Sequence, residues 1–301
     1  MKKWMLLMIA LILVLLSGAV SAEGSANWLD TILGDVGHGE GQIQPADSGA
    51  KRAGKRAQKS LALLFIDGEI IEGGSYYDHP GTLMAIEDLI NDPDNAALLV
   101  VFNTPGGGLY ESDELHHTLS VYKEQTGRPV YAYMKQECCS GGVYAAMAAD
   151  TIYASKMTIT GSVGVYVEAY SEAGLLEKLG IEREFITTGP NKVSGYPTLT
   201  PDQRAIEQAM VDEGFEFFKE VIRSSRGLTD EQMAPFLDGR ILTAKQAKEL
   251  GLVDKVLYYD EAITEIVGQL GEDVDFEDIT PEAETGFEDM ITSELLEWFM
   301  P

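Results

Sequence analysis

The stretch Gln136–Tyr144, QECCSGGVY, joins an apolar run at Val130–Met134 to the small residues Ala145–Ala149. Alanine has a high helix propensity, so the pattern predicts a strand, a tight turn and then a helix that begins at Ser140. A hydroxyl at this position would lie beside free backbone N–H groups and the positive end of the helix dipole. That environment suits a nucleophile whose attack creates an oxyanion, but serine is also a common helix N-cap.

Strands and helices alternate on both sides of this stretch. Short apolar runs bounded by turn residues predict strands, and apolar residues at helical spacing predict helices. The alternation indicates an α/β domain with a largely parallel sheet and flanking helices. The predicted strands are Leu61–Ile66, Ala97–Phe102, Val130–Met134, Thr151–Ala154, a strand that opens at Gly161–Val165, and Glu182–Thr187; the predicted helices are His79–Asn91, Leu109–Lys123, the Ser140 helix, Glu172–Leu179, Pro201–Ser224, Thr229–Leu237 and Thr243–Leu250.

A second glycine-rich turn, Pro105–Gly108, follows the strand predicted at Ala97–Phe102. Sites in doubly wound sheets gather at the carboxyl ends of the strands, so this turn and the Ser140 turn are expected to face one cleft. Glycine lets the backbone approach a ligand closely, and the N–H groups of Gly107 and Ser140 could form an oxyanion hole. Two ordinary turns are the alternative. A phosphate-binding loop is disfavoured, because neither GxxxxGK[ST] nor GxGxxG spacing is present.

A serine nucleophile needs a base, and no histidine follows Ser140 in the chain. Lys192 is the downstream candidate, because it lies in a loop rich in glycine and proline, whereas several other lysines fall on polar helix faces. A lysine acts as a base only when it is neutral, and a Ser–Lys pair is a known variant of the catalytic triad. Ser162, in the turn Gly161–Gly164, could accept or relay a hydrogen bond from the lysine. The two cysteines are adjacent, which gives no metal-ligand spacing.

The ends of the chain differ from its centre. Met1–Lys3 is basic and Trp4–Ala22 carries no charge, which predicts a cleavable signal peptide or an uncleaved signal anchor. Either reading places the folded part outside the cytoplasm. The formal net charge of −27 argues against non-specific nucleic-acid binding. We therefore predict a signal segment at 1–22, a flexible tether at 23–59, a globular domain at 60–270, and an acidic tail with an apolar C-terminus at 271–301.

Several segments, taken together and in order, resemble the S49 family of serine peptidases. They are Thr104–Gly108, Ser140–Gly142, Thr160–Gly164, Asn191–Lys192, Asp238–Arg240 and Thr243–Asp254, and they span roughly residues 60–257.

The resemblance implies a Clp/crotonase-like fold and no cofactor. It implies Ser140 as the nucleophile, Lys192 as the general base, the Gly107 and Ser140 amides as oxyanion donors, and Ser162 as support for the lysine. It also implies a single-pass, membrane-anchored homo-oligomer, with an octamer as the expected assembly and active sites built between neighbouring subunits. The implied substrates are signal-peptide remnants and other hydrophobic peptides outside the cytoplasm.

The residues before the serine depart from the family pattern, because Cys138 and Cys139 stand where small residues are usual. Cys139 is a rival nucleophile, and the two cysteines could instead form a vicinal disulfide or pack as thiols under the turn. A catalytically inactive membrane scaffold with the same fold is the alternative function. The apolar segment Leu295–Pro301 is expected to dock in the peptide groove of its own or a neighbouring subunit.

Overall fold

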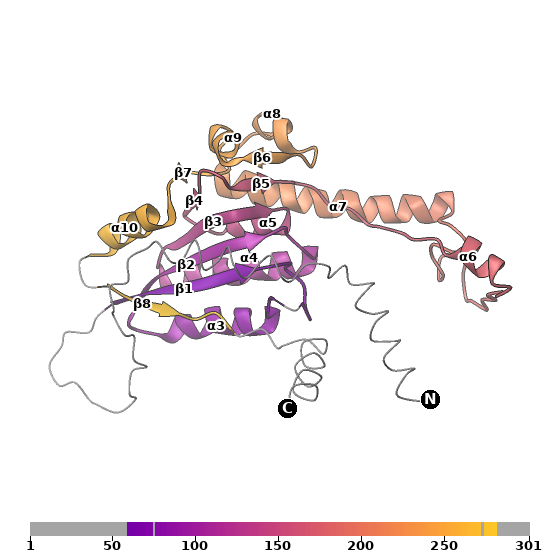
Figure 1. Ribbon diagram of the computed structural model, residues 1–301, viewed down its shortest axis with the longest axis horizontal. Helices are drawn as coiled ribbons and strands as arrows, with labels where there is room; N and C mark the ends of the chain where they lie inside the picture. The colour runs from indigo at the N-terminus through magenta and orange to yellow at the C-terminus, as the bar shows by residue number, and fades with distance from the viewer. Residues whose placement is uncertain (1–58, 75, 272–273, 282–301) are drawn as a thin grey trace, which may run out of the picture. The chain divides into compact units, whose positions relative to one another are not determined.

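An eight-stranded mixed sheet lies at the centre of the computed structural model, which describes residues 59–74, 76–271 and 274–281 (Figure 1). The strand order is β6-β5-β3-β2-β1-β8, and β4 pairs with β3 and β7. Every pairing is parallel except that of β5 with β6, so the predicted α/β architecture is confirmed. The strands are β1 Lys59–Asp67, β2 Asn95–Thr104, β3 Val130–Cys139, β4 Thr151–Ala154, β5 Ile159–Gly161, β6 Ile241–Thr243, β7 Lys255–Val256 and β8 Val274–Asp278.

The helices cover both faces of this sheet. Parallel strands that are covered on both faces are apolar along their whole length, which explains the unbroken apolar runs of β1, β2 and β3. One face packs against α3, α4, α5 and α7, and the other packs against α10. The helices are α3 His79–Asn91, α4 Leu109–Thr126, α5 Gly141–Ala146, α6 Ala173–Lys178, α7 Pro201–Arg226, α8 Asp230–Met233, α9 Ala244–Glu249 and α10 Tyr259–Leu270, with a 3-10 turn at Ala234–Phe236.

Strand β3 is longer than the apolar run that predicted it, and it changes partner along its length. Its first half pairs with β4 through Tyr131–Met134. Its second half, Glu137–Cys139, pairs with β5. The polar residues Lys135 and Gln136 are exposed at the changeover, so a hydrophobicity pattern alone ends the strand too early. The extension carries the chain directly into the Ser140 turn.

Three sequence predictions are corrected by the structure. The segment Glu182–Thr187 is not a strand and is exposed along its length, so no sheet neighbour supplies hydrogen bonds to it. The strand expected to open at Gly161 instead ends there as β5. Part of the expected tail is folded, because β8 pairs in parallel with β1 from Lys59↔Val274 to Leu63↔Asp278.

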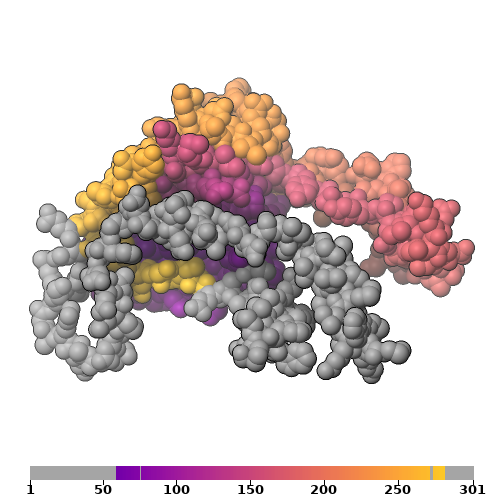
Figure 2. All heavy atoms as spheres, in the orientation of Figure 1, coloured from indigo at the N-terminus to yellow at the C-terminus, as the bar shows by residue number. Residues whose placement is uncertain are grey.

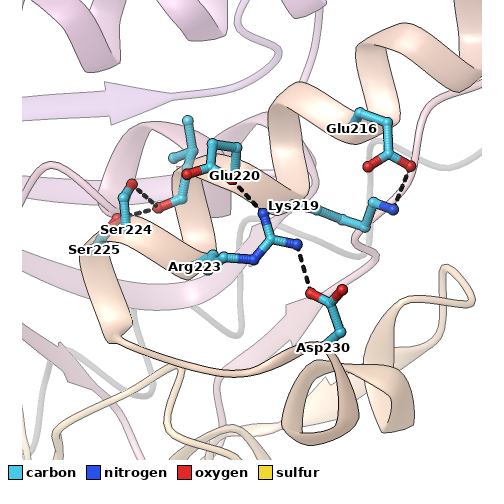
Figure 3. A network of polar contacts seen from close by, with 8 residues as sticks. Glu216, Lys219, Glu220, Arg223, Ser224, Ser225 and Asp230 are labelled. Carbon is cyan, nitrogen blue, oxygen red and sulfur yellow. Dashed lines mark hydrogen bonds and ion pairs between the residues drawn. The ribbon is translucent and has the colours of Figure 1, made fainter.

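Helix α7 is the longest helix in the described chain, and its two ends are fixed by different interactions. Thr200 and Gln203 form a capping box at its start, and Gly227 ends it in a left-handed conformation. Near its C-terminal end, Arg223 bonds to Glu220 and, at 2.5 Å, to Asp230 of α8 (Figure 3). These carboxylates raise the pKa of Arg223, and Arg223 lowers the pKa of Asp230.

The segment between β5 and α7 lies along the N-terminal part of α7, away from the sheet (Figure 1). Gln203 of α7 donates hydrogen bonds to the carbonyls of Pro190 and Val193, at 3.2 and 2.9 Å. Asn191 donates to Asp202 at 2.9 Å. We call residues 166–200 the arm; it is held mainly by the first turns of α7.

Across residues 59–281, as far as the structure describes them, no helix is both long and apolar enough to cross a membrane. The predicted signal segment 1–22 and most of the tether lie outside the described residues, as does the apolar terminus Leu295–Pro301.

Candidate active site

Ser140 lies in a strained turn between β3 and α5. Its φ of 49° and ψ of −118° are unusual for a residue other than glycine, and such conformations cluster at functional sites. It occupies the N-cap position, but its side chain makes no capping hydrogen bond. The half-buried hydroxyl is therefore not used as a helix cap.

The loop after β2 lies against this turn. In the isolated parallel bridge between Ile70 and Gly107, the Ile70 N–H donates to Gly106 at 2.8 Å and the Gly108 N–H donates to Ile70 at 2.9 Å. Gly107 is the central residue of this bridge, so its own N–H points away from Ile70. A Cβ added at Gly141 would lie 3.2 Å from that Gly107 nitrogen, which places the Gly107 amide beside the start of α5.

The expected oxyanion donor pair needs one correction. The Ser140 N–H donates to the Gly161 carbonyl at 2.9 Å, because the β3–β5 ladder continues by one residue past Cys139. The next amide, that of Gly141, is at the first position of α5, where an N–H group has no partner within its helix. Glycine is needed at position 106, where a Cβ would lie 2.8 Å from both the Gly141 nitrogen and the Ser140 Cβ. The geometry therefore pairs the Gly107 amide with the Gly141 amide.

Ser140 lies where two cavities adjoin. One, of about 400 Å³, is lined by Pro105, Gly106, Ser162 and Gly239, and the other, of about 340 Å³, by Leu109, Ser112, Tyr144 and Phe218. Both are also lined by Glu69, Gly107, Ser140, Gly164, Val165 and Tyr166. The structure thus brings Ser140, Gly107 and Ser162 together in one cleft, which the two adjoining cavities form.

Ser162 is held in a second strained turn, with a φ of 52°. Its N–H donates to the Arg240 carbonyl at 2.8 Å, across the end of the β5–β6 pair. Arg240 in turn forms an ion pair with Asp238 at 2.5 Å. Hydrogen bonds from Arg240 lower the pKa of the Asp238 carboxyl to about 2. The backbone of the Asp238–Arg240 turn therefore holds Ser162 in place through this hydrogen bond.

Lys192 is not brought to Ser140 within one chain. It is exposed on the arm, between the two carbonyls that Gln203 binds. The cavity residues Leu109 and Val165 instead pack at Gly214, where an added Cβ would lie 2.7 Å from Leu109. The eleven steps along the helix from Gln203 to Gly214 span roughly 16 Å. No lysine lines either Ser140 cavity in the described part of the chain.

Both cysteines are buried free thiols, so the vicinal disulfide is not present. Burial raises the pKa of Cys139 to about 11 and raises that of Cys138 well above its ordinary value. The Cys139 Sγ faces the Ile159 carbonyl at 3.9 Å, and neither thiol lines the Ser140 cavities. A thiolate is the nucleophilic form of cysteine, so this environment opposes a role for Cys139 as nucleophile.

Two residues of the cleft were not found from the sequence. The Gly141 amide was overlooked because the extension of β3, which occupies the Ser140 amide, was not predicted. Glu69 was overlooked because it lies on a short turn after β1, outside the glycine-rich motifs. The Asp67–Gly68 turn at a strand end was the available signal for Glu69.

Comparisons with known proteins identify similar peptidases. A family model described as peptidase family S49 matches residues 122–271. A putative protease of Synechocystis is 35% identical over 66% of this chain and 70% of its own length. A putative signal peptide peptidase SppA of Enterococcus faecium is 29% identical over 86% of this chain and 76% of its own length.

Two solved structures are also similar to the chain. A mutant of the membrane-bound stomatin-specific protease 1510-N is 15% identical, with a TM-score of 0.48 over 75% of this chain and all of its own. A ClpP1 mutant from Listeria monocytogenes is 18% identical, with a TM-score of 0.45 over 67% of this chain and 94% of its own.

Proposed function

Because the chain belongs to peptidase family S49, we propose that it is a membrane-tethered endopeptidase in which Ser140 is the nucleophile and Lys192 the general base. The observation that carries this proposal is the position of Ser140. Its hydroxyl makes no helix-capping hydrogen bond. The residue lies on a strained turn, where two cavities adjoin, beside the Gly107 and Gly141 amides.

The proposed reaction follows the general logic of acyl transfer. Neutral Lys192 takes the proton of the Ser140 hydroxyl as the oxygen attacks the peptide carbonyl. The Gly107 and Gly141 N–H groups donate to the resulting oxyanion. The Lys192 ammonium then gives its proton to the leaving amine, and water releases the acyl group from Ser140 by the same steps. Ser162, in the shared cleft, would orient the lysine.

A neighbouring copy of the chain is the proposed source of Lys192. The arm that carries it exposes many large apolar side chains, which is unusual for a surface that faces only water. Figure 2 shows the arm, in salmon, extending away from the sheet beside the N-terminal part of α7. The most exposed are Ile186 at 97%, Tyr166 at 84% and Tyr170 at 81%. Packing of this arm against a second subunit would bury these residues and bring Lys192 into the neighbour's cleft; an octamer is the proposed assembly.

Hydrophobic peptides outside the cytoplasm, among them signal-peptide remnants, are the proposed substrates. Apolar cavity residues support this proposal, since Leu109, Val165 and Phe218 line the cleft at Ser140. The uncharged run Trp4–Ala22 after Met1–Lys3 supports a single-pass anchor with the folded part exported.

A complementation experiment tests the proposal. Ser140→Ala and Lys192→Ala should each lower kcat/KM for a hydrophobic peptide by at least about 10³-fold. If the site is shared between subunits, unfolding and co-refolding the two inactive variants together should restore part of the activity, because mixed oligomers contain intact Ser140–Lys192 pairs. Full activity of either single variant would reject the dyad. An absence of Ser140-dependent cleavage and of labelling by a serine-directed probe would favour the inactive scaffold.

A further inference from the structure

We infer that Glu69 gives the Ser140 cleft a preference for peptides with a cationic side chain next to the scissile bond; this inference rests on the proposed peptidase function. Among the described residues that line the two cavities, Glu69 is the only charged one, and it lines both. A substrate bound in either cavity would therefore lie near the same negative charge, that of the Glu69 carboxylate.

The Glu69 backbone is fixed on both sides. Before it, Gly68 has a φ of 81° and its N–H donates to the Asn103 carbonyl at 3.1 Å. After it, Ile70 forms the bridge to Gly107 through hydrogen bonds of 2.8 and 2.9 Å. Glu69 is thus one residue away from the segment that holds the Gly107 amide, so its distance from the reacting carbonyl is set by the fold.

The Glu69 carboxylate is available to a ligand. Within the described part of the chain, its side chain forms neither an ion pair nor a hydrogen bond. The side chain is exposed in the single chain, so water solvates the charge until a substrate enters. An amine or guanidinium group that replaces this water would form a charge-assisted hydrogen bond. An uncharged side chain of the same length would remove the water without such compensation, and an acidic one would be repelled.

The spacing between residues of an extended peptide indicates which substrate side chain can reach the Glu69 carboxylate. Successive residues of such a peptide are about 3.3 Å apart, and the cavities adjoin at Ser140. The carboxylate therefore reaches substrate residues close to the scissile bond on one or both sides. The apolar residues of the cleft would bind the rest of the peptide, so the preferred substrate combines apolar residues with one basic residue at its cleavage site.

The test compares peptides that carry lysine or Nε-acetyl-lysine at each of the two positions on either side of the cleaved bond. At one or more of these positions, the unmodified protein should hydrolyse the lysine peptide with a kcat/KM about fivefold higher at low salt. High salt should shrink this ratio, because it screens the charges. Glu69→Gln should bring the ratio close to one. Glu72→Gln is the matched control: it makes the same charge change on the same exposed loop, outside the cavity lining, and should preserve the ratio.

Binding to the Ser140→Ala variant separates failure of this inference from failure of the proposed function. In this variant, fluorescence anisotropy should show about fivefold tighter binding of the lysine peptide than of its acetylated form, even if hydrolysis is not observed. Equal binding at every position would overturn the inference, as would loss of the ratio in Glu72→Gln. A preference that disappears on acetylating the peptide N-terminus instead would assign the site to an α-amino group and would also overturn it.

Discussion

The backbone N–H of Ser140 donates a hydrogen bond of 2.9 Å to the carbonyl of Gly161, the residue that precedes Ser162. The turns that carry the two serines of the cleft are therefore joined by the last rung of the β3–β5 ladder. This hydrogen bond fixes the two turns next to each other. The same bond occupies the Ser140 N–H, so the proposed oxyanion donors are the amides of Gly107 and Gly141.

Gly141→Ala should lower kcat by about 10²-fold, because an added Cβ would lie 2.2 Å from the Ser112 Oγ and would displace the amide proposed as an oxyanion donor. Gly174→Ala on α6 is the matched control, since nothing lies within 4 Å of its added Cβ. Steady-state kinetics on the two variants, with circular dichroism to verify folding, would measure the difference. Normal kcat in Gly141→Ala would remove that amide from the mechanism.

Ile186→Asp should dissociate the proposed oligomer and abolish activity at the same time, because it puts a charge into the apolar arm that carries Lys192. Met84→Asp, on the exposed side of α3, should leave both properties unchanged. Sedimentation velocity and peptide hydrolysis at equal protein concentration would measure the two effects. An Ile186→Asp variant that stays assembled, or one that is monomeric and fully active, would contradict the shared site.

Cys139→Ala should lower activity by less than about tenfold, far less than the loss of about 10³-fold expected for Ser140→Ala. With a pKa of about 11, the Cys139 thiol is neutral at pH 7 and should react slowly with thiol reagents. Reactivity should increase as the pH rises toward 11.

The raised pKa also affects stability. Because the thiol of an unfolded chain ionises near pH 8.5, pH values above 8.5 favour unfolding. Timed labelling at several pH values would measure this; rapid labelling at pH 7 with parallel loss of activity would revive the cysteine alternative.

Arg240→Gln should raise the pKa of Asp238 from about 2 toward its ordinary value near 3.9, since the hydrogen bond from Arg240 is the main cause of the depression. The depressed pKa means that the Asp238–Arg240 interaction favours the folded state above pH 3.9. This contribution decreases as the pH falls through 3.9 toward 2. Carboxyl carbon chemical shifts in an NMR titration would report the pKa directly. If Asp238 has the same pKa in the unmodified protein and in Arg240→Gln, the Asp238–Arg240 interaction does not stabilise the turn that binds the Ser162 N–H.

Thr280→Val should lower the free energy of unfolding by about 1 kcal/mol, because it removes the acceptor of the 2.9 Å hydrogen bond from the Phe65 N–H. Valine keeps the side-chain volume, so the change isolates the loss of the oxygen. Thr264→Val, on an exposed part of α10, provides the comparison. Urea denaturation of both variants would measure the difference. Unchanged stability of Thr280→Val would indicate that this hydrogen bond does not stabilise the fold.

Much of the cleft could be predicted from the sequence, for a clear physical reason. Ser140 follows β3, Gly107 follows β2 and Ser162 follows β5, and parallel strands end at one edge of the sheet. Glycine-rich turns after apolar runs therefore converge without any knowledge of long-range contacts. The resemblance to family S49 was built on these same motifs.

The remaining features depend on tertiary contacts that leave little trace in a local pattern. The exposed residues Lys135 and Gln136 interrupt the apolar pattern of β3, so the pairing of Glu137–Cys139 with β5 was not evident. Strand β8 is acidic and was assigned to the tail, although Phe276 and Val274 alternate with its charges. The placement of Lys192 depends on the contact of the arm with α7, and its encounter with Ser140 would depend on a second chain.

Strand β8 also affects whether a strand of another molecule can pair with the edge of the sheet. It is the terminal strand of the described sheet, and three of its five residues, Asp275, Glu277 and Asp278, are acidic. An edge strand offers unpaired backbone groups on which another protein's strand can add, which is a route to aggregation. A second copy approaching through its own β8 would bring Glu277 and Asp278 against the same acidic side chains. The same charges that made this segment look like a solvated tail thus favour solubility at high local concentration.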